Sequence, residues 1–170
     1  NHSLDYLYGG LLSTRDYLNL AGVLHSGTGK DLAEARAPAY AEYPQGRVAL
    51  VSASSTFASF GRAGDARRDL SGRPGLNPLR FKTWWTVKEE SLEAIKELEL
   101  ELGISDLVQP DGAHIFLRQK FVVGDDVGMH TKPHAEDMAG NLESIGDAAR
   151  MADWVLFSLH AHEGLPHDRE

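Results

Sequence analysis

The apolar run of residues 154–159 ends abruptly in a histidine-rich step, and it limits the folds open to this chain more than any other stretch. Apolar runs of this length between polar residues are typical of strands buried on both faces of a sheet. His160 and His162 follow the run, with Glu163 beside them. Side chains two residues apart in an extended chain point to the same side, so both imidazoles should face one way. The pattern fits a pair of metal ligands or, equally well, two solvated residues at a strand end.

Other strands and helices can be placed from the spacing of apolar residues and from glycine and proline stops. The predicted strands cover residues 47–52, 81–87, 113–123 and 154–159. The predicted helices cover residues 11–21, 31–36, 87–102 and 133–152. We expect Asp31 or a neighbouring residue to cap the second helix, and Thr86 with Glu89 to form a capping box for the third. This alternation predicts a layered α/β fold, in which chemistry gathers at the carboxyl ends of the strands.

The composition is that of an ordinary globular protein and excludes several classes of function. The chain has 170 residues, 42% of them hydrophobic, which is enough for one domain with a core. A formal net charge of −8 argues against nucleic acid as a partner. Without cysteine there is no disulfide or thiolate metal site, and no apolar run reaches the ~20 residues that span a bilayer. Because the chain starts at Asn1 without methionine, we expect a piece of a larger domain.

Two loops have the residues to bind an anion. Residues 27–30, Gly-Thr-Gly-Lys, resemble a phosphate-binding loop, but Asp31 stands where that loop needs Ser or Thr, so we expect a tight turn. The loop of residues 61–79 contains four arginines: Arg62, Arg67, Arg68 and Arg73. Four guanidiniums cannot all be desolvated without partners, so we expect them outside the core. They form a solvated mobile loop or, if they face His160, a clamp for an anionic substrate.

The helix predicted for residues 87–102 should bury one face against the sheet. Its apolar spacing places Leu92, Ile95 and Leu102 on that face. The acidic residues of the same helix should form a solvated face; they are Glu97, Glu99 and Glu101. His114, in the next predicted strand, is interpreted as a bonded structural histidine rather than a ligand.

Several short sequence motifs are distributed along the chain, from Asn1 to the histidine step. They are Asn-His-Ser-Leu-Asp-Tyr at 1–6, Gly-Leu at 10–11, Leu-Ala-Gly at 20–22, Gly-Thr-Gly-Lys-Asp-Leu-Ala-Glu-Ala at 27–35 and Leu-His-Ala-His-Glu at 159–163. Together they resemble the CapA family of capsule or poly-γ-glutamate synthesis proteins. The resemblance implies a calcineurin-like fold, an α/β layered sandwich of the metallo-dependent phosphatase type. It also implies a location in the bacterial cell envelope or outside the cytoplasm.

The chain departs from the family pattern at both ends. The family has an earlier strand with an aspartate and a histidine, then a Gly-Asp turn, and it has a later Gly-His-x-x-His block. Neither is found in this sequence. We therefore expect residues 1–170 to form a single but partial metallophosphatase-like domain, with N-terminal and C-terminal parts missing.

The resemblance implies roles for residues near the start of the chain. Asn1 matches an asparagine that binds a metal ion. His2 matches the neighbouring histidine, which contacts the phosphate and protonates a leaving group. Asp5 would orient His2, so His2 and Asp5 are the implied catalytic pair. We expect Asn1 and His2 to lie close to His160 in space.

The histidine step has roles implied by the same resemblance. His160 matches a downstream metal ligand, and His162 and Glu163 are assigned to substrate binding. The implied cofactors are divalent ions, Mn, Fe or Zn, which polarise phosphate oxygens and generate hydroxide at neutral pH. Asn1 and His160 bring no negative charge, so we expect the pair of ions in the complete domain and not in this chain alone.

Three classes of function remain open. The first is a capsule or poly-γ-glutamate biosynthesis protein with a metallophosphatase-like site, whose partner is an anionic polymer. The second is a metal-dependent phosphoesterase that acts on an unknown phosphate ester. The third is a metal hydrolase of the amidohydrolase or PHP kind. This class is disfavoured because its His-x-His step lies near the start of the domain, whereas His160 and His162 lie near the end of this chain. Fold and motif do not by themselves establish turnover, and the sequence does not give the oligomeric state.

Overall fold

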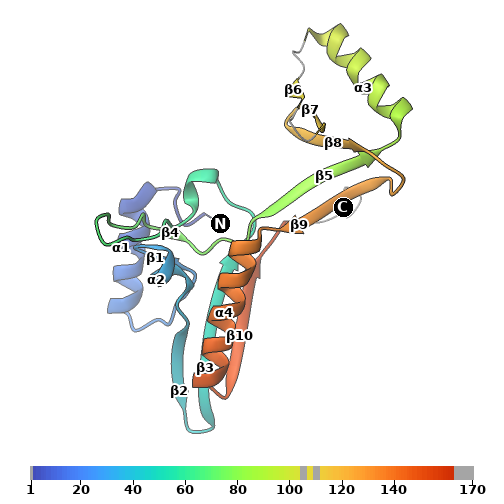
Figure 1. Ribbon diagram of the computed structural model, residues 1–170. Helices are drawn as coiled ribbons and strands as arrows, with labels where there is room; N and C mark the ends of the chain where they lie inside the picture. Colours follow the sequence, from blue (N-terminus) through green and yellow to red (C-terminus); the bar gives the residue numbers. More distant parts are fainter. Residues whose placement is uncertain (1, 104–106, 109–111, 163–170) are drawn as a thin grey trace. The chain divides into compact units, whose positions relative to one another are not determined.

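The computed structural model describes residues 2–103, 107–108 and 112–162, which form a mixed α/β chain divided into two compact units (Figure 1). Among these residues, the first unit contains everything up to Arg80 and everything from Pro133 onwards, and the second is Phe81–Lys132. The predicted α/β class is confirmed, whereas the metallophosphatase sandwich stays a prediction. Within the described ranges, no helix combines the length and the apolar character needed to cross a membrane.

The first unit is built on a three-stranded sheet that carries the histidine step. Its strands are β10 (Trp154–His160), β3 (Gly46–Ser54) and β2 (Ala39–Tyr43), in the order β10-β3-β2. β10 runs parallel to β3 with His160 opposite Ser54, and β2 runs antiparallel to β3. The strands predicted at residues 47–52 and 154–159 are both confirmed. Because they are parallel, their carboxyl ends lie together at one end of the sheet.

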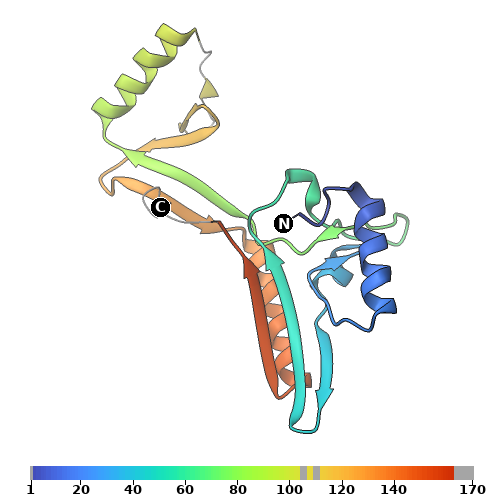
Figure 2. The same cartoon turned by 180° about the vertical axis from the view of Figure 1, so that it is seen from behind.

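Helix α4 (Ala135–Met151) covers one face of this sheet, and Figures 1 and 2 show it lying along β3 and β10. Its Ala148 is fully buried with Ala49 and Val51 of β3. Four half-buried side chains pack around this small core: Tyr40, Ile145, Ala152 and Val155. Alanine on both sides lets helix and strand approach closely, so the helix predicted at residues 133–152 has a clear packing role.

Strand β10 is less buried than its sequence predicts. The side chains of Trp154 and Leu156 are 66% and 57% exposed, and Leu159, on the other side of the strand, is 42% exposed. β10 is the outer strand of its sheet, and α4 covers the side that Val155 faces. The prediction of a strand buried on both faces is therefore wrong for the described part of the chain. An apolar run indicates that a strand can be covered, but not which element covers it.

The remaining helices and strands of the first unit lie beside this sheet. They are α1 (Leu7–Leu20), β1 (Thr28–Gly29), α2 (Leu32–Arg36), η1 (Ser59–Gly61) and β4 (Gly75–Leu76), with β1 antiparallel to β4. Asp31 caps α2 as predicted, because its side chain accepts a 2.8 Å hydrogen bond from the Glu34 amide. A Cβ atom at Gly29 would lie 2.3 Å from the Ala35 nitrogen. Gly29 is thus held close to α2, but the tight turn predicted for residues 27–30 is wrong, because Thr28 and Gly29 form strand β1.

The arginine-rich loop folds back on itself as an arm of residues 62–73. Backbone bridges join positions 64 and 73, and positions 67 and 70. None of its arginines is in the core: Arg67, Arg68 and Arg73 are exposed, and Arg62 is half-buried. Their predicted place outside the core is confirmed, whereas the predicted mobility stays a prediction.

A buried polar network ties the segment before β5 to the first unit. Asn77, which is fully buried, donates from Nδ2 to the Ser52 carbonyl at 2.9 Å and to Oδ1 of Asn141 at 2.8 Å. Asn141 in turn donates to the Pro78 carbonyl at 3.0 Å. The end of β3, this segment and α4 are therefore held together by two asparagine side chains.

The two ends of the second unit return to neighbouring positions in the first. The amide of His134 donates to the carbonyl of Arg80 at 2.7 Å. Next to this bond, the Arg80 guanidinium binds both oxygens of Asp137, with Nε–Oδ2 at 2.6 Å and Nη2–Oδ1 at 2.8 Å. The residues that enter and leave the second unit are thus fixed to each other by a backbone bond and an ion pair.

The second unit combines a five-stranded sheet with one helix. Its strands, in order across the sheet, are β6 (Leu107–Val108), β7 (His114–Phe116), β8 (Gln119–Val123), β5 (Phe81–Val87) and β9 (Gly128–Pro133). β5 has the predicted bounds. The single strand predicted at residues 113–123 is wrong, because β7 and β8 form an antiparallel hairpin. The turn between them places Leu117 and Arg118 at positive φ. Because this conformation usually requires glycine and neither residue is glycine, the sequence does not predict the turn.

Helix α3 (Glu89–Leu102) follows β5 and ends at Gly103, which has the left-handed conformation typical of helix ends. The predicted capping box is wrong because Thr86 belongs to β5, and Lys88 is the N-cap without a side-chain hydrogen bond. Leu92 is buried as predicted and Ile95 is half-buried. The predicted burial of Leu102 is wrong, because this last residue of α3 is 57% exposed.

The acidic face of α3 is not solvated throughout. Glu99 is 3% exposed, and its Oε2 lies 2.7 Å from Nε2 of the buried His114. The prediction that Glu99 is solvated is therefore wrong, because a histidine partner makes its burial tolerable. The interpretation of His114 as a bonded structural histidine is confirmed.

Candidate functional site

The loop of residues 54–61, which starts at the last residue of β3, contacts the segments that carry His2, His160 and His162. Ser54 is buried at the end of β3, and its hydroxyl donates to the Thr56 carbonyl at 3.0 Å. Its backbone donates to the Asn77 carbonyl at 3.0 Å and accepts from the Leu79 amide at 2.8 Å. The loop therefore starts from a position fixed on two sides.

The histidine end of β10 is attached to this loop. The Ser55 amide donates to the His160 carbonyl at 2.9 Å, and the His162 amide donates to the Thr56 hydroxyl at 3.0 Å. The two imidazole rings lie 4.7 Å apart between centroids and are tilted by 55°. The His-x-His step thus brings both rings together, as period-two spacing predicts.

The N-terminal turn is attached to the same loop. Leu4 is 5% exposed, and a Cβ atom placed on Gly61 would lie 3.6 Å from its Cδ1 and 3.7 Å from Cδ2 of Phe57. His2 and Asp5 flank this anchor, with Nδ1 of His2 2.9 Å from Oδ2 of Asp5. The predicted orienting contact is therefore present, although both side chains are largely exposed.

The end of β10 offers two candidate metal ligands. His160 and His162 provide two imidazole donors of the kind that Mn, Fe or Zn accept, and Nε2 of His160 is buried. In the ranges that the structure describes, no group of three or more His, Asp or Glu side chains could hold one ion. Asn1 and Glu163 lie outside those ranges, so their predicted roles, like the sharing of one site by His2 and His160, stay predictions.

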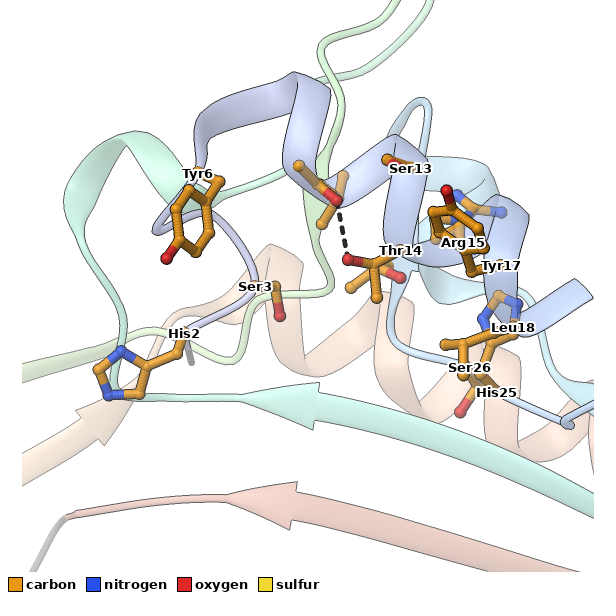
Figure 3. Close-up of a pocket in the computed structure, with 13 residues that line it drawn as sticks. His2, Ser3, Tyr6, Ser13, Thr14, Arg15, Tyr17, Leu18, His25 and Ser26 are labelled. Atoms are coloured by element: carbon orange, nitrogen blue, oxygen red, sulfur yellow. Dashed lines mark hydrogen bonds between the residues drawn. The ribbon is translucent and has the colours of Figure 1, made fainter. Parts of the chain in front are cut away.

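A cavity of about 540 Å³ opens beside His2, and sequence reasoning did not find it. It lies between α1 and the segment before β1. Figure 3 shows His2 and Tyr6 at one end of the view and His25 and Ser26 at the other. Arg15 of α1 also lines the cavity and is 13% exposed. The lining combines imidazole, phenol, hydroxyl and guanidinium groups, so it suits a polar ligand with negative charge or hydroxyls.

Arg15 is held in the cavity wall by Glu34. The Arg15 guanidinium donates to Oε1 of Glu34, and the Lys30 amide donates to Oε2 at 2.6 Å. Burial alone would raise the pKa of Glu34, but these hydrogen bonds and the charge of Arg15 outweigh burial and lower that pKa. Arg15 Nη1 is buried and makes no hydrogen bond within the described residues. No sequence signal links Arg15 with Glu34, because α1 and α2 meet only through the tertiary fold.

The family of the chain follows from its match to a family model. Residues 1–168 match the model described as bacterial capsule synthesis protein PGA_cap. This chain belongs to that family. The predicted resemblance to capsule synthesis proteins is thereby confirmed over nearly the whole chain.

Two curated relatives of equal similarity come from Sinorhizobium fredii (strain NBRC 101917 / NGR234). They bear the names uncharacterized protein y4sH and uncharacterized protein y4uA. Each is 31% identical to this capsule-family chain over 164 residues, which are 96% of this chain and 36% of the relative. The chain therefore spans about a third of the length of these relatives.

Proposed function

We propose that this chain carries part of a metallophosphatase-like centre in a protein of capsule synthesis. The observation that supports the proposal most directly is the shared anchor: the loop of residues 54–61 holds the His2 turn through Leu4 and the end of β10 through Ser55 and Thr56. Residues from the two ends of the chain are thereby attached to one short segment at the carboxyl end of β3. Open α/β sheets bind ligands at this end of their strands.

The roles in this centre follow the resemblance and the contacts together. Asn1 and His160 would hold the metal, which would polarise a phosphate oxygen and supply hydroxide when bound. His2 would donate a proton to the leaving group, and Asp5 would keep its ring in one orientation through the 2.9 Å contact. His162 and Glu163 would face the substrate.

The cavity beside His2 is the natural place for that substrate. It begins at the proposed proton donor, and hydroxyl and imidazole groups line it, together with Arg15, which is paired with Glu34. An anionic capsule polymer or its phosphate-bearing precursor would satisfy these groups.

A histidine series in the whole protein that contains this chain tests the proposal. His160→Ala should lower the bound metal measured by elemental analysis and should lower the capsule polymer made by a bacterium that depends on this protein. His2→Asn should keep the metal and lose the polymer. His130→Ala is the matched control, because His130 stacks on Trp84 in the second unit, with ring centroids 5.4 Å apart. Full metal content in the His160→Ala protein would contradict the assignment.

A metal-dependent phosphoesterase is the second candidate, and the His2–Asp5 pair favours it. An imidazole held in one orientation can act as the general acid that protonates a leaving group. Hydrolysis of a generic phosphomonoester or phosphodiester by the metal-loaded protein, lost in His2→Asn, would establish this activity. Equal rates in the wild type and His2→Asn would contradict it.

A further inference from the structure

A second cavity, of about 270 Å³, lies in the first unit and shares no lining residue with the cavity beside His2. Arginines from separate segments line it: Arg36 ends α2, Arg62 begins the arm of residues 62–73, and Arg80 precedes β5. The other charged groups of the lining are the carboxylates Asp65, Glu136 and Asp137. The balance between these groups determines which ligand the cavity can take.

Arg80 is already neutralised. Asp137, which is 2% exposed, binds its guanidinium through both oxygens and accepts its backbone amide at 3.0 Å. Burial alone would raise the pKa of Asp137, but these hydrogen bonds outweigh it and hold that pKa below its usual value. The hydrogen bond to Asp137 also raises the pKa of Arg80. The pair is a fixed, ionised wall of the cavity.

Arg36 and Arg62 are not neutralised in the same way. Arg36 is 20% exposed; its Nη2 lies 3.7 Å from Asp137, whose charge Arg80 already engages, and 3.4 Å from the Glu136 carbonyl. Its Nε is buried without a hydrogen bond in the described part of the chain. Arg62 is half-buried, and across the described residues no hydrogen bond or ion pair of its guanidinium is found. Glu136 and Asp65 are exposed, so water and salt screen their charge.

Gly140 explains how Arg36 keeps this position. A Cβ atom on Gly140 would lie 2.3 Å from Nη1 and 2.4 Å from Cζ of Arg36. The guanidinium therefore rests directly on the backbone of α4, in space that any other residue would occupy. Within the described residues, Arg36 and Arg62, which are both half-buried, therefore have N–H donors without acceptors in a small polar cavity. Buried N–H donors require hydrogen-bond acceptors.

We propose that this cavity binds a small oxyanion, a carboxylate or phosphate group, between Arg36 and Arg62. The planar fork of a guanidinium matches either group through paired hydrogen bonds, and partial burial strengthens the attraction. The Arg80–Asp137 pair stays intact and closes one side. The site stands apart from the proposed capsule function and does not depend on it.

Titration of the purified chain with orthophosphate and, separately, with glutarate tests the site, with amide NMR shifts of residues 62–65 and 136–140 as the readout. We expect saturable binding of at least one probe, weaker at higher salt. Stronger binding of orthophosphate identifies a phosphate site, and stronger binding of glutarate identifies a carboxylate site.

Three variants decide whether these residues form the site. Arg62→Gln and Gly140→Ala should each weaken binding by about tenfold or more, since each removes charge-assisted hydrogen bonds. Gly140→Ala acts by displacing Arg36, and alanine is favourable inside a helix, so the fold should persist. Arg68→Gln, an exposed arginine of the same arm, is the control and should bind as the wild type does. No saturable binding of either probe, or unchanged affinity in Arg62→Gln, would overturn the proposal.

Discussion

Removing the side chain of Asn141 should destabilise the first unit by more than an ordinary polar substitution. Asn141 accepts from Asn77 at 2.8 Å and donates to the Pro78 carbonyl at 3.0 Å, and both asparagines are almost completely buried. In Asn141→Ala, the Pro78 carbonyl loses this donor, and Asn77 keeps its bond to the Ser52 carbonyl alone.

The expected cost can be worked out from these bonds. A buried polar group that loses its partner costs about 1–3 kcal/mol, so Asn141→Ala should cost about 3 kcal/mol in the free energy of unfolding. Asn77→Ala should cost about 2–3 kcal/mol for the same reason. Because the bond between the two asparagines is lost in either variant, the double variant should fall short of the sum by roughly 1–2 kcal/mol.

Amide hydrogen exchange of Ala49 and Val51 is the appropriate measurement, because these buried β3 residues report on the first unit alone. Asn19→Ala, on the exposed side of α1, is the control and should change the free energy by less than about 0.5 kcal/mol. If the costs of Asn77→Ala and Asn141→Ala add within about 0.5 kcal/mol, the two side chains do not act as one network and the reasoning is refuted.

Three further outcomes are expected. Asp137→Asn should destabilise the first unit at neutral pH. The pKa of Asp137 is lower in the folded than in the unfolded protein, so the stability that its carboxylate contributes is complete above the ordinary pKa of 3.8. That stability is lost as the pH falls through the lower folded pKa. Urea midpoints measured from pH 7 to pH 2 should therefore converge below about pH 4, and a constant gap would contradict this. Glu99→Leu removes the 2.7 Å partner of His114 and should cost the second unit about 1–3 kcal/mol by hydrogen exchange, whereas an unchanged exchange rate would exclude a stabilising pair. Ile95→Ala, at a half-buried position, should cost about 1–2 kcal/mol, below the range for a fully buried isoleucine, and a cost above 4 kcal/mol would show that α3 is covered more completely.

The elements that could be predicted are those with a local cause. The apolar run of β10, the helical spacing of α4 and the aspartate that caps α2 each act within a few residues, so their positions are readable in the sequence. The capping box failed because Thr86 had a competing place in the ladder of β5, where strand pairing outweighs a cap.

The parts that could not be predicted depend on residues far apart in the chain. Asn77 meets Asn141, and Arg80 meets Asp137, only once α4 has packed on the sheet, and no periodicity marks either pair. The burial of Glu99 depends likewise on His114 in another element. For the candidate site, the His-x-His geometry was readable from strand period, whereas the cavity lined by Arg15 was not.

The bond between the Arg80 carbonyl and the His134 amide has a consequence for how this chain can vary. Residues 81–132 leave and re-enter the first unit through adjacent backbone positions, so a closing turn of a few residues could replace them without moving α4 or β3. Such a segment is free to be shortened, lengthened or exchanged during evolution while the framework that carries the histidines keeps its shape.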